Sequence, residues 1–65
     1  MKVRDMIRLI EKDGWVCVRQ KGSHRQYKHS SKPGLVTIPV HRMSNELAMG
    51  TEKSILKQAQ IEIKK

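Results

Sequence analysis

One short stretch, from Lys21 to Lys28, holds most of the side chains that could do chemistry. At its centre is His24, and histidine is the side chain that most readily takes up and releases a proton near neutral pH. Gly22 can adopt a positive φ and lets a ligand approach the backbone closely, and Ser23 adds a small hydroxyl. Three cations lie around the histidine: Lys21, Arg25 and Lys28. This pattern predicts proton transfer on a phosphate-bearing ligand, although a basic hairpin tip with an incidental histidine has the same composition.

Size and composition limit the class of protein. The 65 residues suffice for one small domain, residues 1–65, near the lower size at which a chain folds unaided. The single cysteine, Cys17, cannot form an internal disulfide, which favours a reducing compartment. No apolar run approaches the roughly 20 residues that span a bilayer, and the N-terminus lacks the apolar stretch of a signal peptide. These features predict a cytoplasmic protein.

Positive charge is the strongest bulk signal. Fourteen Lys and Arg against six Asp and Glu give a formal net charge of +8. A field of this size attracts polyanions and speeds encounter with them. Nucleic acid, an acidic protein and an anionic membrane surface all fit this charge, so charge alone does not choose the partner.

The start of the chain has helical periodicity. An apolar stripe falls at i, i+3, i+4 and i+7, namely Val3, Met6, Ile7 and Ile10. Gly14 follows the last apolar turn, where a glycine commonly ends a helix. We therefore predict a helix over residues 3–13.

Three segments rich in strand formers follow, over residues 15–20, 24–29 and 35–40. Turn residues separate them, including Pro33 and Gly34. Pro39 cannot donate a ladder hydrogen bond, so the third strand ends there or has an open edge. Short connections between three strands predict an antiparallel meander.

Period-two alternation assigns the strand side chains to two faces. In the first strand one face carries Val16 and Val18, and the other carries Trp15, Cys17 and Arg19. In the second strand one face carries His24, Gln26 and Lys28, and the other carries Arg25, Tyr27 and His29. Packing roles are expected for Cys17 and Tyr27, and a solvated position at the strand end for His29.

The end of the chain predicts a second helix. Ser44 and Asn45 are good N-caps, so residues 46–48 are expected to begin a helical turn, with Gly50-Thr51 interrupting it or marking the true start. Its buried stripe is Ile55, Leu56 and Ala59, with Lys53 and Lys57 outward. Residues 61–63 alternate and either extend the structure or fray. The predicted fold class is α+β, in the order α-β-β-β-α, with a three-stranded antiparallel sheet and two helices on one face.

Taken in this order, the motifs resemble those of HicA toxins, the small RNA-cleaving members of HicA–HicB toxin–antitoxin pairs. Three stretches carry the resemblance and cover most of the chain. They are residues 11–15 (Glu-Lys-Asp-Gly-Trp), residues 21–29 with Lys-Gly-Ser-His and then Tyr-Lys-His, and residues 37–59, from Thr-Ile-Pro-Val-His to Gly-Thr and Ser-Ile-Leu-Lys-Gln-Ala. The family's fold is similar to double-stranded-RNA-binding domains, which agrees with the predicted element order.

The resemblance also carries residue roles. The family's Gly-Ser-His glycine and catalytic histidine fall on Gly22 and His24. Many relatives have Lys-Pro before the Gly-Thr pair and an apolar residue after it, where this chain has residues 48–49 (Ala-Met) and Glu52. These departures concern the second helix rather than the histidine.

The resemblance implies a metal-independent endoribonuclease that cleaves mRNA and needs no cofactor. RNA supplies its own nucleophile, the 2′-hydroxyl beside each scissile phosphate, and His24 would act as general acid or base. Gly22 and Ser23 would position the substrate, and the phosphate-binding cations would be Lys21, Arg25 and Lys28. Lys53 and Lys57 either contact phosphates as well or form an ordinary solvated helix face.

A second proton-transfer group is not evident in the sequence. Alternation places His29 on the face opposite His24, and His41 follows the third strand, so it approaches only if that edge curls inward. A zinc site would need Cys17 together with the three histidines. Alternation separates these side chains and no paired Cys/His spacing is present, so no metal site is expected.

The resemblance implies two partners, a HicB-like antitoxin and RNA, with no membrane partner and a toxin that is monomeric when alone. We expect an acidic antitoxin face to cover residues 22–28, because it would complement the cations there. Two other functions fit the charge: a non-catalytic module like a double-stranded-RNA-binding domain, and a basic adaptor for an acidic protein.

Overall fold

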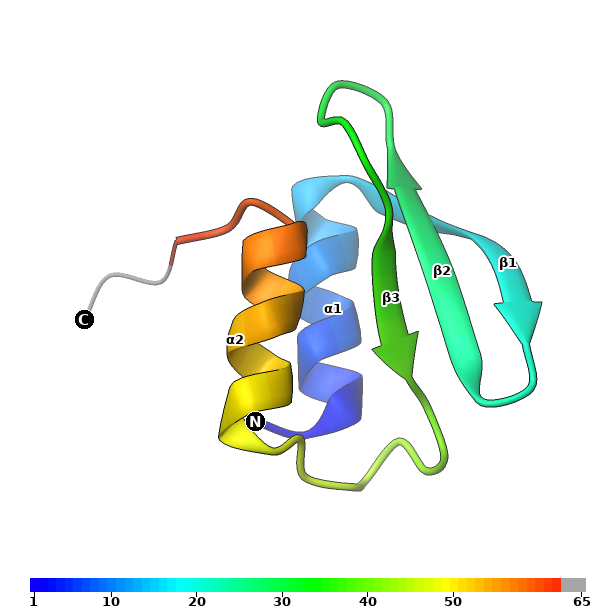
Figure 1. Cartoon of the computed structure of the whole chain (residues 1–65), viewed down its shortest axis with the longest axis vertical. Coiled ribbons are helices and arrows are strands. Elements are labelled where there is room, and N and C mark those ends of the chain that lie inside the picture. The colour runs from blue at the N-terminus through cyan, green and yellow to red at the C-terminus, as the bar shows by residue number, and fades with distance from the viewer. Residues whose placement is uncertain (63–65) are drawn as a thin grey trace.

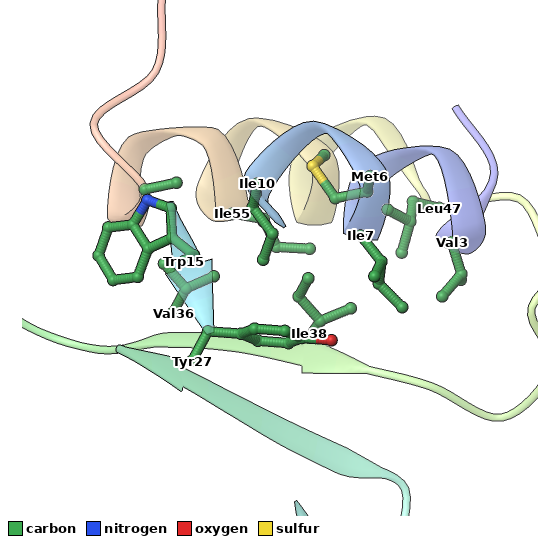
Figure 2. Close-up of a cluster of buried hydrophobic side chains, with 11 residues drawn as sticks. Val3, Met6, Ile7, Ile10, Trp15, Tyr27, Val36, Ile38, Leu47 and Ile55 are labelled. Atoms are coloured by element: carbon green, nitrogen blue, oxygen red, sulfur yellow. The ribbon is translucent and has the colours of Figure 1, made fainter. Parts of the chain in front are cut away.

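The computed structural model describes residues 1–62 and has the predicted order of elements (Figure 1). These are α1 (Val3–Asp13), β1 (Trp15–Lys21), β2 (His24–His29), β3 (Val36–Pro39) and α2 (Met49–Gln58). The strands form an antiparallel sheet in the order β1-β2-β3. Both helices lie over one face of this sheet (Figure 2). The predicted α-β-β-β-α fold, similar to double-stranded-RNA-binding domains, is confirmed; Ile63 lies outside the described residues.

The first helix ends where the sequence predicted. Its apolar stripe is fully buried, as expected for Val3, Met6, Ile7 and Ile10. Gly14 has φ 110°, a left-handed conformation that favours glycine. Its N–H donates to the carbonyls of Ile10 and Glu11, which closes the last turn of α1.

Side chains from both layers fill the core (Figure 2). The sheet contributes Trp15, Tyr27, Val36 and Ile38, all almost fully buried. The Tyr27 ring has no exposed surface, and its hydroxyl has no hydrogen-bond partner among residues 1–62. Burial raises the pKa of this hydroxyl above its usual value near 10. Tyr27 is therefore the packing residue that the sequence predicted.

The second helix begins later than its capping residues suggested. Residues 46–48 are extended rather than helical, because they pair with the N-terminus: Glu46 forms a bridge with Lys2, and the Leu47 N–H donates to the Met1 carbonyl at 2.9 Å. The N-cap is Ala48, with no side-chain cap. Of the two predicted alternatives, a helical turn at 46–48 is wrong because these backbone groups already have partners elsewhere in the fold. A start marked by Gly50-Thr51 agrees with α2, which begins at Met49.

The second helix ends in a Schellman motif formed without glycine. Gln60 has φ 55°, its N–H donates to the Lys57 carbonyl at 3.1 Å, and the Ile61 N–H donates to the Leu56 carbonyl at 3.0 Å. Leu56 and Ile61 both pack against the core. The turn places Gln60 beside the loop that follows β2.

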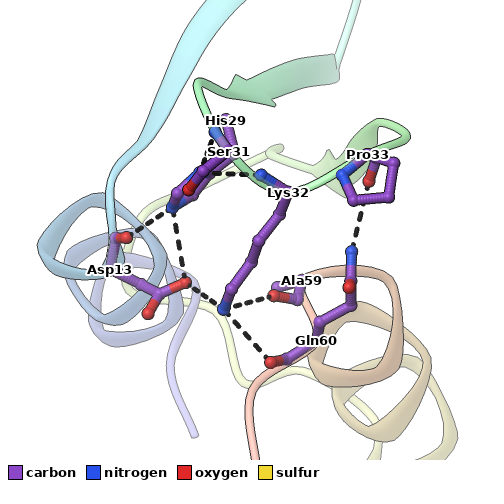
Figure 3. Close-up of polar contacts among 7 residues, drawn as sticks. All are labelled: Asp13, His29, Ser31, Lys32, Pro33, Ala59 and Gln60. Atoms are coloured by element: carbon purple, nitrogen blue, oxygen red, sulfur yellow. Dashed lines mark hydrogen bonds and ion pairs between the residues drawn. The ribbon is translucent and has the colours of Figure 1, made fainter.

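A polar cluster joins the C-terminal ends of both helices to that loop (Figure 3). The Lys32 ammonium lies 2.6 Å from a carboxylate oxygen of Asp13 and donates to the carbonyls of Ala59 at 3.3 Å and Gln60 at 3.1 Å. The Gln60 side chain donates to the Pro33 carbonyl at 3.2 Å. We call these five residues the Lys32 junction. It ties together three segments that are far apart in the sequence.

His29 lies next to this junction and is not the solvated residue that was predicted. Its side chain is only 9% exposed, and the edge of its ring packs on Trp15 with centroids 5.2 Å apart. The main-chain N–H groups of Ser31 and Lys32 donate to Nδ1 at 3.0 and 3.2 Å, so Nε2 carries the proton and donates to the Asp13 carbonyl at 2.7 Å. The prediction failed because these backbone partners come from two other segments.

Two constraints act on Gly14, its positive φ and its close approach to the His29 ring, and they can be separated experimentally. A Cβ at Gly14 would lie 2.8 Å from His29 Nε2, whereas a Cβ at Gly34, also at positive φ, would meet nothing within 4 Å. We expect Gly14→Ala to lower the free energy of unfolding by about 2–3 kcal/mol, against about 1 kcal/mol for Gly34→Ala. Chemical denaturation of both variants measures this. Equal losses would show that contact with His29 does not constrain Gly14.

The Asp13–Lys32 pair predicts a particular response to acid. The hydrogen bond from Lys32 holds the pKa of the Asp13 carboxyl below its usual value of 3.8. A carboxylate with a lowered folded-state pKa stabilises the fold above about 3.8, and that stability disappears as pH falls through the folded-state pKa. Asp13→Asn should therefore melt at a lower temperature than the wild type near neutral pH, and the gap should close in strong acid.

The matched control for this experiment is Glu11→Gln, which removes one charge from α1 outside the ion pairs found in residues 1–62. Its melting temperature should stay close to that of the wild type across the same pH range. An Asp13→Asn gap that stays constant into acid would contradict a role for the Asp13 charge.

Candidate functional site

The turn between β1 and β2 holds His24 in a defined position. Only two residues, Gly22 and Ser23, connect the strands. Gly22 has φ 58° while Ser23 has negative φ, the combination found in type II′ hairpins with glycine first. The Ser23 carbonyl accepts a hydrogen bond from the Val40 N–H, which anchors the turn to the end of β3. His24 therefore begins β2 on a turn that both neighbouring strands restrain.

The register of the sheet decides which face His24 occupies. His24 is paired with Lys21 on β1 and with Pro39 on β3, while Tyr27 is paired with Val36. Since Tyr27 and Val36 are buried against the helices, the alternate residues of β2 face away from them. His24, Gln26 and Lys28 thus lie on the face that no helix covers, which we call the open face.

A β-bulge at Val18 changes the face assigned to Arg19. The register shifts between Cys17, which is paired with Tyr27, and Arg19, which is paired with Gln26. The predicted alternation placed Arg19 on the same face as Trp15 and Cys17, and that placement is wrong. One extra residue returns Arg19 to the open face. The sequence carried a signal for this, because strict alternation aims a guanidinium at the apolar layer, where burial of a charge is costly.

An open depression of about 580 Å³ lies on this face. All three strands contribute to its lining, which consists of Arg19, Lys21, His24, Gln26 and Thr37. Lys21 and His24 were singled out in the sequence, whereas the other three were not. Alternation alone predicts that Gln26 lies on the same face as His24. The sequence does not predict the register of β3 that places Thr37 opposite Gln26.

Cations dominate the open face. None of the three strands contains an aspartate or glutamate. The cations on this face are Arg19, Lys21 and Lys28, and none of them forms an ion pair with a carboxylate of residues 1–62. A concave surface lined by one sign of charge attracts ligands of the opposite sign, so this face is suited to a polyanion.

Arg25 was proposed beside these cations, but the structure places it on the other face. It is paired with Ile38, a core residue, and its Nε atom is buried without a hydrogen-bond partner among residues 1–62. Lys28 is on the open face at the far end of β2, paired with Val16. The structure therefore brings Lys21 together with His24 and separates Arg25 from both.

A model of a protein family, the HicA toxins of bacterial toxin–antitoxin systems, matches residues 3–61. The chain belongs to the HicA toxin family. The match includes all five elements and every residue that lines the depression. No curated protein matches the chain. Membership assigns the chain a toxin role and implies an antitoxin as its partner.

The remaining histidine of this HicA chain lies apart from the open depression. His41 lines a second depression together with Asn45, Glu46 and Leu47, beyond the end of β3. The His29 side chain is mostly covered on the helix side, as described above. His24 is therefore the histidine that lines the depression, and no carboxylate lines it beside His24.

Two other sequence expectations, for Cys17 and for the lysines of α2, have a structural outcome. Cys17 is exposed, so the packing role predicted for it is wrong. Lys53 and Lys57 are exposed on α2, in the layer that covers the opposite face of the sheet from His24. Within residues 1–62, no cluster of three or more His, Cys, Asp or Glu side chains could hold a metal ion, and no helix is long and apolar enough to cross a membrane.

Proposed function

We propose that this HicA-family toxin is an endoribonuclease that cleaves mRNA and so inhibits translation, with His24 as its general acid or base. The observation that carries the proposal is the position of His24 in a depression lined by cations on strands without carboxylates. RNA cleavage requires anion binding and proton transfer, and side chains suited to each lie in this depression. We assign this activity to a single HicA-like domain over residues 1–65, acting as a cytoplasmic monomer.

The reaction needs only groups that RNA and this chain provide. A base removes the proton of the 2′-hydroxyl, the 2′-oxygen attacks the adjacent phosphorus, and the bond from phosphorus to the 5′-oxygen breaks. An acid returns a proton to that 5′-oxygen, which leaves a 2′,3′-cyclic phosphate and a 5′-hydroxyl. The His24 imidazole fits either proton transfer. No step uses a metal ion or a cofactor.

The surrounding residues of the turn supply positioning and charge. Gly22 has open space where a side chain would project, so the RNA backbone can approach the turn there. Ser23 adds a hydroxyl and a main-chain carbonyl fixed to β3. Lys21 and Lys28 offer ammonium groups to phosphates along the strand, and they partly neutralise the charge that develops on phosphorus.

The antitoxin would act most directly by covering residues 22–28. A carboxylate-presenting face, such as a HicB-like antitoxin could offer, would pair with the cations of the open face and bury His24. RNA and antitoxin would then compete for the free toxin.

A non-catalytic RNA-binding module is the second candidate. One observation favours it: neither a second histidine nor a carboxylate lines the depression beside His24. The fold and charge fit this alternative equally well. Cleavage itself separates the two functions.

Replacement of His24 tests the catalytic assignment. We expect His24→Ala to slow cleavage of a defined RNA by about 10²–10⁴-fold in the presence of a chelator. Because His24 is exposed, the free energy of unfolding should change by no more than about 0.5 kcal/mol. His41→Ala is the matched control and should cleave normally. Near-normal cleavage by His24→Ala, or loss of wild-type activity in chelator, would contradict the proposal.

The salt dependence of RNA affinity tests which face binds RNA. Each phosphate contact on a single strand contributes a slope of roughly −0.7 in log K against log[salt]. Lys28→Ala, on the open face, should make the slope about 0.7 shallower, while Lys57→Ala, on the helix layer, should leave it unchanged. Titration of a labelled RNA into the His24→Ala background avoids cleavage. A shallower slope for Lys57→Ala alone would place the RNA on the helices instead.

A further inference from the structure

We infer that Arg19 is the residue that binds the scissile phosphate of the RNA, through its guanidinium and the non-bridging phosphate oxygens. This inference rests on the proposed function of the same site and names a residue that neither the sequence motif nor the family match singles out. The structural device behind it is the β-bulge at Val18. Bulges commonly redirect a side chain next to a functional site.

The register places Arg19 at a suitable distance from His24. Arg19 is opposite Gln26, and His24 is two residues before Gln26 on the same face of β2. Such diagonal neighbours are about 7–8 Å apart, and their β-carbons are somewhat closer than that. That spacing leaves room for one phosphate group between the guanidinium and the imidazole. Both side chains line the same depression.

Arg19 is available to a ligand. It is exposed, and among residues 1–62 no carboxylate forms an ion pair with it. The acidic groups of the chain that do form ion pairs bind Lys32, His29 or the N-terminus, on the helix side of the molecule. A guanidinium without a protein counter-ion, beside a proton-transfer group, is arranged to receive an anion.

The chemistry favours arginine over the lysines of the same face. A guanidinium presents parallel N–H groups that match two oxygens of one phosphate, whereas an ammonium acts as a point charge. Two fixed donors aimed at the equatorial oxygens stabilise the charge that forms there as the 2′-oxygen attacks. Arg25, the other arginine of the turn region, cannot take this role because it belongs to the helix face with Nε buried.

The experiment compares Arg19→Ala and Arg19→Lys with the wild type in single-turnover cleavage at saturating RNA. Arg19→Ala should lower the rate by about 10²–10³-fold, with a much smaller loss of RNA affinity. Arg19→Lys should keep affinity within about threefold while the rate stays at least tenfold low, because charge is retained and the paired donors are lost. Arg8→Ala, which removes an exposed arginine from α1, is the matched control and should cleave normally.

The outcomes separate this inference from the function on which it rests. If the wild type cleaves, His24→Ala does not, and Arg19→Ala cleaves at a near-normal rate, the role of Arg19 is refuted and the nuclease stands. Full activity of Arg19→Lys would also refute it, because a point charge would then suffice. If the wild type does not cleave RNA, the proposed function fails and the role of Arg19 in cleavage fails with it. Thermal unfolding of each variant must match the wild type, since a fall in melting temperature would assign Arg19 to folding instead.

Discussion

Tyr27 lies in the middle of the central strand with no exposed surface, and its ring faces the helices (Figure 2). Side chains alternate along a strand, so this one burial places His24, Gln26 and Lys28 on the opposite face. A slip of one residue would expose the Tyr27 ring and bury polar and charged groups in its place. Register is strongly specified wherever one face is buried. The location of the candidate site therefore depends on the packing of a residue that takes no part in its chemistry.

The two faces of the sheet differ in charge as well as in packing. The carboxylates that form ion pairs belong to the helix layer and its connections: Asp13 binds Lys32, while Glu46 and Glu52 lie 3.2 and 3.4 Å from the N-terminal ammonium. The strands carry cations and no carboxylates. Positive charge on the sheet is thus left without compensation within residues 1–62. The open face therefore presents to solvent cations that have no carboxylate partner within residues 1–62.

A chain of this size has few residues with which to close its core, and the Lys32 junction contributes to that closure. Small domains bury a smaller fraction of their surface than large ones. Here one lysine links the ends of both helices, and the buried ring of His29 packs beside it against Trp15. The last main-chain carbonyls of a helix have no partner within it. Here the Asp13 carbonyl accepts from His29, and the Ala59 and Gln60 carbonyls accept from Lys32. The sheet that carries the open face is therefore held in place by these contacts on its helix side.

The sequence alone determined the order of elements, the helix stop at Gly14 and the face of His24, because each follows from local periodicity or turn chemistry. Four features were decided only by tertiary structure. The Val18 bulge depends on how β1 meets β2, and the burial of His29 depends on backbone partners from the end of α1 and the loop after β2. The late start of α2 follows from pairing of residues 46–47 with the N-terminus. Thr37 reaches the depression only through the register of β3. Asp13, which accepts from His29, and the N-terminal residues that pair with 46–47 are distant in sequence, so local periodicity does not predict these contacts.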